Sequence, residues 1–416
     1  MSARRLLLAT VASSALLTCV SSARSAAGEK PDKPGSTVPS EPVFAALLID
    51  GTTVSGRIQK LGPGGEIVLE NGEERTLPLR RLVKLSREGS PPPFPPEGST
   101  LALFPEGDRL RAVIGSAGET ALETRSYILG DVSIPLDALL GLVLAPPTEP
   151  EEFEDLLGRV REQPRTTEVL WLANGDRLSG GFLGLTPRQV SFQPEGGQVS
   201  IDRSQVVALG FDPKLVDYPR PKGDYFELTL ADGSRFGVSD LKIEKGQVEA
   251  TSRFGAAIKL AIGDLSRIHM RNPSVIYLSE RKPDEAAYVT YVGPSRPYRR
   301  DAAVDGHCLR LASEPYDRGL GTQSRTLLAY RLSPSDHRFQ ATVGLDDRAG
   351  PLGSVVFRVS VDGQDRFVSP PMSLRDPPRP IDIDVAGAKA LILVTEFGER
   401  GEVRDFADWV EARLIR

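Results

Sequence analysis

The side chains best suited to binding chemistry lie in the last third of this 416-residue chain. Asp346 and Asp347 follow an alternating apolar segment, which places two carboxylates on a loop at a strand end. Such a pair can bind Ca²⁺ together with backbone carbonyls, or accept hydrogen bonds from sugar hydroxyls. The alternative is a turn cap, in which each Asp side chain accepts hydrogen bonds from nearby backbone N–H groups.

A second polar cluster lies near the C-terminus, where Asp405 and Asp408 precede Trp409. The indole of Trp409 is either an exposed platform for the apolar face of a sugar or a core residue whose N–H finds a partner. Asp408 is placed to form a bidentate ion pair with Arg318 or Arg310.

A glycine-rich turn, Arg318-Gly319-Leu320-Gly321, carries a third group of polar residues. Glycine allows backbone angles there that are closed to other residues. Tyr316, Gln323 and Ser324 flank the turn. They form either a rim that contacts a sugar or a set of groups that satisfies the loop's own backbone.

Apolar alternation predicts the strands that must hold these groups in place. Segments 326–330, 339–344, 354–361, 381–385 and 390–395 are β-forming, and Asp362-Gly363 ends the third as a tight hairpin turn. The last third of the chain is therefore predicted to be an all-β domain.

This region resembles the NPCBM family of carbohydrate-binding modules. The resemblance covers about a third of the chain and rests on Tyr277-Leu278-Ser279, Tyr316, Arg318-Gly319-Leu320-Gly321, Ser324, Val343-Gly344-Leu345-Asp346-Asp347, Gly353-Ser354-Val355-Val356-Phe357, Asp362-Gly363, and Asp405 with Ala407-Asp408-Trp409. It implies a galactose-binding-like β-sandwich (jelly roll) over residues 274–416. The candidate ligand-binding residues are then Tyr316, Arg318, Gln323, Asp346, Asp347, Asp408 and Trp409. Gln323 stands where the family's G-L-G-x-H-S run has His, so the identity of the sugar is not carried over.

The N-terminus predicts export. Arg4 and Arg5 precede an apolar run over residues 6–20, and small residues at 25–27 suit cleavage, so residues 1–27 are predicted to be a signal peptide. Lipidation at Cys19 is the alternative to cleavage. Residues 28–42 are polar and Pro-rich, which predicts a disordered leader. The mature protein is expected in the periplasm, in the cell envelope or outside the cell.

The middle of the chain is an internal repeat. Glycine turns recur at Gly51, Gly107, Gly175 and Gly233, and an apolar-x4-apolar-x2-apolar template begins 26 or 27 residues after each. Units this small bury little apolar surface. We therefore expect four SH3- or Sm-like β-barrel repeats, at residues 43–89, 98–146, 166–212 and 224–271. They are expected to pack in two pairs or to share strands.

One segment has helical periodicity, in the longest gap between those glycines. Residues 148–163 begin with a capping box of Thr148 and Glu151, and apolar residues between Phe153 and Val160 fall on one face. We expect this helix to link the repeats and to dock between the first and second repeat pairs. The alternative is a helix that binds a partner.

Composition and motifs argue against several classes of function. The net charge of −5 and the absence of a basic patch argue against nucleic-acid binding. His307 and Cys308 point to opposite faces of a strand and lack a CxxC or HxxxH partner, so no metal site is predicted there. No GxSxG elbow, P-loop or HExxH motif is present, and we do not expect an enzyme.

The sequence thus predicts an exported, non-catalytic protein whose C-terminal sandwich binds a galactose-like glycan or glycoconjugate. The repeats would serve as a spacer or a second interaction surface. One alternative is a structural cell-envelope protein that uses the sandwich for protein contacts, and another is an accessory subunit of a glycosidase. No transmembrane span is predicted in the mature chain. Ca²⁺ at Asp346 and Asp347 is the only cofactor suggested.

Overall fold

The computed structural model describes residues 41–62, 65–89, 100–291, 296–399 and 401–416. The predicted signal peptide and nearly all of the predicted leader lie outside the described residues. The all-β class is confirmed, because the described residues form strands and 3₁₀ turns around a single α-helix, α1 (Pro150–Glu162). Within this part of the chain no helix combines the length and apolarity that crossing a membrane requires.

Four segments share one strand order. In each, four antiparallel strands form a meander, a 3₁₀ turn follows, and the fifth strand pairs with the first. The first segment contains β1 (Val43–Leu48), β2 (Thr53–Gly62), β3 (Glu66–Asn71), β4 (Glu73–Pro78), η1 (Leu79–Arg81) and β5 (Leu82–Arg87). The second contains β6 (Thr100–Leu103), η2 (Pro105–Gly107), β7 (Arg109–Ala117), β8 (Ala121–Ser126), β9 (Gly130–Pro135), η3 (Leu136–Ala138) and β10 (Gly141–Val143).

The third and fourth segments repeat this order beyond α1. The third contains β11 (Glu168–Leu172), β12 (Arg177–Leu185), β13 (Gln189–Gln193), β14 (Val199–Asp202), η4 (Arg203–Gln205) and β15 (Val206–Gly210). After η5 (Pro213–Leu215), the fourth contains β16 (Tyr225–Leu230), β17 (Arg235–Glu244), β18 (Gln247–Ser252), β19 (Ala257–Ala261), η6 (Ile262–Asp264) and β20 (Leu265–Arg271). The likeness to SH3 or Sm folds stays a prediction.

A glycine closes the first hairpin of every segment. The φ angles are +82° at Gly51, +81° at Gly107, +89° at Gly175 and +82° at Gly233. Glycine reaches this left-handed region without the steric penalty that other residues meet. The four turns of the sequence repeat are therefore four copies of one backbone conformation.

The first segment pairs with the fourth, and the second pairs with the third. Strand β5 of the first segment pairs with β20 of the fourth, and β10 of the second pairs with β15 of the third. Long strands also meet at Leu61↔Ile243 and at Ala117↔Leu185. Each of these residues lies ten positions after its own turn glycine, so equivalent positions face each other as in a two-fold dimer. The expectation that the helix docks between two pairs is wrong, because α1 connects the two members of one pair.

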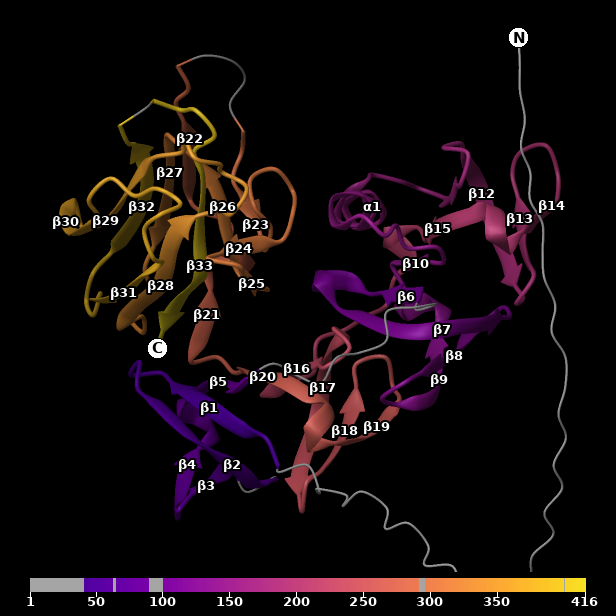
Figure 1. Cartoon of the computed structure of the whole chain (residues 1–416), viewed down its shortest axis with the longest axis horizontal. Helices are drawn as coiled ribbons and strands as arrows, with labels where there is room; N and C mark the ends of the chain where they lie inside the picture. Colours follow the sequence, from indigo (N-terminus) through magenta and orange to yellow (C-terminus); the bar gives the residue numbers. More distant parts are fainter. Residues whose placement is uncertain (1–40, 63–64, 90–99, 292–295, 400) are drawn as a thin grey trace, which may run out of the picture. The chain divides into compact units, whose positions relative to one another are not determined.

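Helix α1 covers the outer face of the sheet that β6, β10, β15 and β11 form (Figure 1). Leu156, Leu157 and Val160 pack there against Leu101, Leu103, Val143, Val169, Trp171 and Ala208. Strands with apolar residues on both faces need this second cover. The predicted capping box is not formed, because the N-cap residue is Glu149 and its side chain makes no capping hydrogen bond.

Replacing Gly141 with Ala is expected to loosen this helix and to destabilise the protein by about 1–3 kcal/mol. A Cβ at Gly141 would lie 2.4 Å from Val160 Cγ1 and 2.6 Å from the Leu209 carbonyl oxygen. Gly158→Ala on α1 is the matched control, because its Cβ would meet nothing within 4 Å. It should stabilise by about 0.5–1 kcal/mol through helix propensity. Urea denaturation measures both, and a Gly141→Ala protein as stable as wild type would contradict the packing.

Residues 275–415 form a β-sandwich, as predicted. One sheet has the order β23-β26-β33-β28-β31 with β21 also paired to β33, and the other has the order β22-β27-β32-β29-β30. Its strands are β21 (Val275–Tyr277), β22 (Glu285–Tyr288), β23 (Arg299–Arg300), β26 (Gly319–Gln323), β27 (Thr326–Arg331), β28 (Arg338–Leu345), β29 (Val355–Val361), β30 (Gln364–Val368), β31 (Arg379–Asp384), β32 (Ala390–Phe397) and β33 (Phe406–Ile415). The turn η7 (Leu278–Glu280) and the separate hairpin of β24 (Leu309–Leu311) and β25 (Glu314–Tyr316) complete it.

The sandwich has its own core and also packs on the first segment. Phe339, Phe357, Leu393 and Trp409 are among the residues buried between its sheets. Val83 of β5 packs with Tyr277 and Ile415, so the sandwich covers part of the outer face of the β5–β20 sheet.

Candidate functional site

The structure places Asp346 and Asp408 together, away from solvent. Both are 0% exposed, and strands β28 and β33 bring them side by side. The Asp346 carboxylate accepts hydrogen bonds from the backbone N–H groups of Arg348 at 2.9 Å and Arg310 at 3.2 Å. Burial and the charge of Asp346 raise the pKa of Asp408 well above its usual range. The raised pKa favours the protonated form of Asp408 beside Asp346. Both carboxyls are buried, so neither is placed on a ligand-binding surface.

Asp347 forms a turn cap. Its Oδ2 accepts a hydrogen bond from the Ser313 backbone N–H at 2.9 Å. No group of three or more His, Cys, Asp or Glu side chains among the described residues is arranged to hold a metal ion. Ca²⁺ takes six to eight oxygen ligands, whereas both oxygens of Asp346 and Oδ2 of Asp347 accept hydrogen bonds from backbone N–H groups. Calcium binding at Asp346 and Asp347 stays an untested prediction.

Trp409 is a core residue, which corrects its place among the ligand-binding candidates. The side chain is 1% exposed, and its Nε1–H donates to Thr395 Oγ1 at 3.0 Å. The ring packs edge-on against Phe357, with centroids 5.2 Å apart. No face of the indole is therefore available to a sugar.

Gln323 lies next to a small chain of polar groups. Its Oε1 is buried and has no hydrogen-bond partner among the described residues. The neighbouring Ser324 hydroxyl donates to Asp405, which also accepts the Ser354 N–H at 2.9 Å. Burial raises the pKa of Asp405 to about 6.

A pocket of about 380 Å³ opens at Ser354. It is lined by Pro351, Gly353, Ser354, Ser373, Leu374, Arg375 and Glu399. Arg375 and Glu399 are exposed and offer hydrogen-bond donors and acceptors, while Leu374 is 37% exposed and offers an apolar contact. Convergent polar groups beside apolar surface are what a small-molecule site requires.

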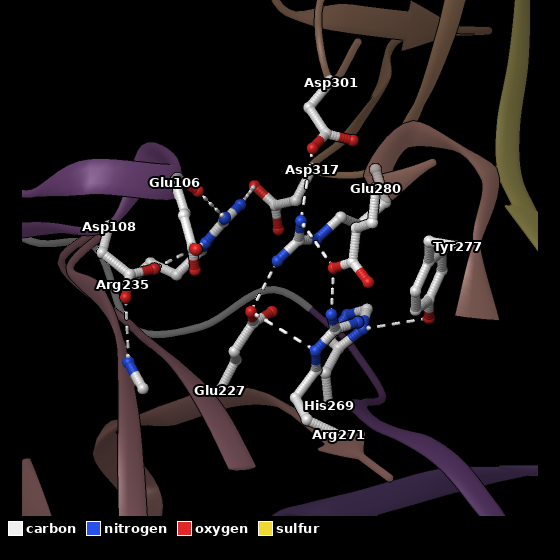
Figure 2. A network of polar contacts seen from close by, with 12 residues as sticks. Glu106, Asp108, Glu227, Arg235, His269, Arg271, Tyr277, Glu280, Asp301 and Asp317 are labelled. Carbon is white, nitrogen blue, oxygen red and sulfur yellow. Dashed lines mark hydrogen bonds and ion pairs between the residues drawn. The ribbon is translucent and has the colours of Figure 1, made fainter. Parts of the chain in front are cut away.

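Arg318 extends from the sandwich into the fourth segment. It is 2% exposed, and its Nη2 donates to Glu227 at 2.5 Å. Its Nη1 lies 3.2 Å from Asp301 and 3.3 Å from Glu280. Arg271 also contacts Glu227 and Glu280, as Figure 2 shows. Burial alone would raise the pKa of Glu227, but the two guanidinium groups outweigh it and hold this pKa at about 2. The predicted ion pair of Arg318 with Asp408 is replaced by this network.

The network continues to the second segment through Arg235 (Figure 2). The Arg235 guanidinium lies 3.2 Å from Asp317 and 3.5 Å from Asp108, and it donates to the Glu106 carbonyl oxygen at 2.9 Å. Asp108 also accepts a hydrogen bond from the Tyr218 hydroxyl at 2.9 Å. Buried ions from the second segment, the fourth segment and the sandwich are therefore joined in one cluster.

A cleft of about 730 Å³ opens beside this cluster. Its walls come from α1, from the second and fourth segments and from the sandwich. Nine arginines and six acidic residues line it, so its lining is basic although the chain is acidic overall: Arg109, Arg111, Arg161, Arg220, Arg235, Arg267, Arg300, Arg310 and Arg318 face Glu106, Glu154, Glu162, Glu280, Asp301 and Asp317. Tyr316 and Arg318 are the two predicted ligand-binding residues in this lining.

The charged residues buried around Arg318 were not among the predicted site residues. Glu227 on β16, and His269 and Arg271 on β20, alternate with apolar residues, which is the pattern of a solvent-facing strand face. This face is buried because the sandwich covers it, and burial lowers the pKa of His269 to about 3. The available signal was a cluster of charges on the outer strands of one repeat.

Comparison with known families identifies the C-terminal domain. The family model described as "NPCBM/NEW2 domain" matches residues 274–415, which confirms the resemblance. A curated protein of Renibacterium salmoninarum, named "Putative endo-alpha-N-acetylgalactosaminidase", is 28% identical over 155 residues, or 34% of this chain and 10% of that protein. The chain thus spans about a tenth of the length of this curated relative.

Solved structures similar to this chain include CBM51 domains. CBM51 from Clostridium perfringens GH95, in complex with methyl-galactose, is 28% identical and covers 34% of this chain and 99% of its own, with a TM-score of 0.31. The CBM51-2 and INT domains of Clostridium perfringens ZmpB, in complex with GlcNAc, are 23% identical over 43% of this chain and 40% of theirs, with a TM-score of 0.32.

Proposed function

We propose that this chain is an exported, non-catalytic carbohydrate-binding protein whose NPCBM domain binds a neutral, galactose-like sugar. The observation that supports carbohydrate binding is the family match over residues 274–415, which coincides with a sandwich that has a core of its own. The glycosidase activity in the relative's name is not transferred, because the chain spans about a tenth of that protein. Export rests on residues 1–27, which lie outside the described residues.

The pocket at Ser354 is the proposed sugar site. Arg375 donates to sugar hydroxyls, the Glu399 carboxylate accepts from them, and Leu374 packs on the apolar face of the ring. All three line the pocket. These groups lie on loops of a scaffold whose strands are fixed by the sandwich core, which is the usual position of binding residues.

Arg375→Ala is expected to weaken glycan binding by roughly 10-fold, because it removes charge-assisted hydrogen bonds to the sugar. The full chain is applied to a glycan array, and the affinity for the sugar class it binds is then measured for wild type and variant. Arg358→Ala is the control, since Arg358 pairs with Asp365 on the β29–β30 hairpin and does not line the pocket. Failure of the folded wild type to bind any glycan would refute the proposed function, and equal loss in both variants would refute the pocket.

A further inference from the structure

Arg161 is a partly buried cation for which the structure shows no ion pair or side-chain hydrogen bond at Nε or Nη2 among the described residues. It lies in the last turn of α1 and lines the basic cleft. Its Nε and Nη2 are buried and have no hydrogen-bond partner among the described residues. Burial, together with the nearby charges of Arg109 and Arg235, lowers the pKa of Arg161 to about 10, although Glu154 and Asp108 oppose the shift. Buried polar groups that lack a partner are rare in native proteins and commonly mark a bound ion or ligand.

Arg109 lines the same cleft, and its positive charge is only partly balanced by nearby acidic groups. Its Nε donates to the Gly233 carbonyl oxygen at 2.9 Å, and burial lowers its pKa although Asp317 opposes the shift. Asp317 is already shared by Arg235 at 3.2 Å and Arg267 at 3.1 Å. Glu154 of α1 also lines the cleft and attracts Arg109 and Arg161 from a distance. The acids present therefore leave positive charge between Arg109 and Arg161.

We propose that the cleft binds the carboxylate or sulfate group of an acidic saccharide between Arg109 and Arg161. Guanidinium groups present forked N–H donors that match the oxygens of these anions, and their hydrogen bonds to anions are among the stronger ones in proteins. The volume of about 730 Å³ lies in the range of small-ligand sites, and the half-buried Tyr316 gives the sugar ring a surface to pack on. The saccharide part of the assignment rests on the proposed function, whereas the anion part rests on the arginines alone.

Calorimetric titration of the full chain at low salt tests the proposal. The probes are a sulfated disaccharide, a uronate disaccharide, a neutral disaccharide of the same linkage and sodium sulfate. Both acidic disaccharides should bind and the neutral one should not bind at this cleft. Arg161→Gln should weaken acidic binding by roughly 10- to 100-fold, because it removes charge-assisted hydrogen bonds. Arg159→Gln, on the exposed side of the same helix, should leave the affinity within about twofold.

Thermal unfolding separates binding from a structural role. Arg161 has no hydrogen-bond acceptor for Nε or Nη2 among the described residues, so Arg161→Gln should not lower the melting temperature. A lower melting temperature with unchanged acidic binding would overturn the proposal, as would equal affinities of the two variants. Sulfate binding that Arg161→Gln abolishes, without binding of either acidic disaccharide, would overturn the saccharide assignment. Because the neutral-sugar pocket is tested separately through Arg375, the two proposals can fail independently.

Discussion

Replacing Arg318 with Met is expected to destabilise the protein by about 3–5 kcal/mol, because buried carboxylates would lose the positive charge that they pair with. Glu227 is 4% exposed and would keep only Arg271, whose Nε lies 3.6 Å away. Glu280 and Asp301 would also lose a contact, at 3.3 and 3.2 Å. The shift in urea midpoint near pH 7 measures the effect. Adding Glu227→Gln to Arg318→Met should restore part of the loss, because the unpaired charge is then gone.

Arg338→Met is the matched control for Arg318. Arg338 also pairs with a carboxylate, that of Asp382, but the two side chains are 45% and 35% exposed. Exposed pairs of this kind contribute about 0–1 kcal/mol. Similar losses in the two variants would mean that burial of the Arg318 network has no energetic consequence.

This contrast shows what the network contributes to the molecule. A buried ion pair often stabilises a protein no more than an apolar pair of similar size would. Removal of one charged partner nevertheless lowers the free energy of unfolding strongly, because the other charge stays buried. We expect the network to act mainly on specificity, because only a sandwich placed with Arg318 against Glu227 of the fourth segment satisfies both charges. We expect it to select one arrangement of the sandwich on the fourth segment.

The elements that could be predicted correctly from the sequence are those determined by neighbouring residues along the chain. The turn glycines could be found because a positive φ favours glycine at Gly51 and at each equivalent position. The strands of the sandwich followed from period-two alternation, which the burial pattern of β29 reproduces. The apolar stripe of α1 likewise predicted the face that Leu157 and Val160 bury.

The pairing of the repeats could not be predicted from such rules. All four segments present a fifth strand at the equivalent position, so the apolar alternation of β5 does not by itself indicate β20 rather than β10 as its partner. The same limit applied to the charged residues. Glu227 alternates with apolar neighbours, and this pattern is the same whether water or the sandwich covers its face. The residues around Trp409 likewise do not distinguish an exposed indole from the buried one that the structure shows.

Replacing Asp408 with Asn is expected to stabilise the protein at neutral pH by about 1–3 kcal/mol. Burial and Asp346 raise the pKa of Asp408 in the folded protein well above the value of 3.8 for a free carboxyl. The folded state therefore holds a proton that the unfolded state releases as the pH rises above about 4. The free energy of unfolding therefore falls as the pH rises through this interval. Asn removes that pH dependence because its amide does not ionise, and the amide N–H can donate to the nearby Asp346 carboxylate.

Urea midpoints at about pH 5 and about pH 8 test this for both proteins. The wild type should lose more stability than Asp408→Asn between the two values. Asp376→Asn is the contrasting control, because hydrogen bonds from the Ser373 N–H and hydroxyl lower the pKa of this exposed carboxyl, so the variant cannot produce the gain. If Asp408→Asn proved less stable than wild type at both pH values, Asp408 would be ionised in the folded protein and the pairing with Asp346 described above would be wrong.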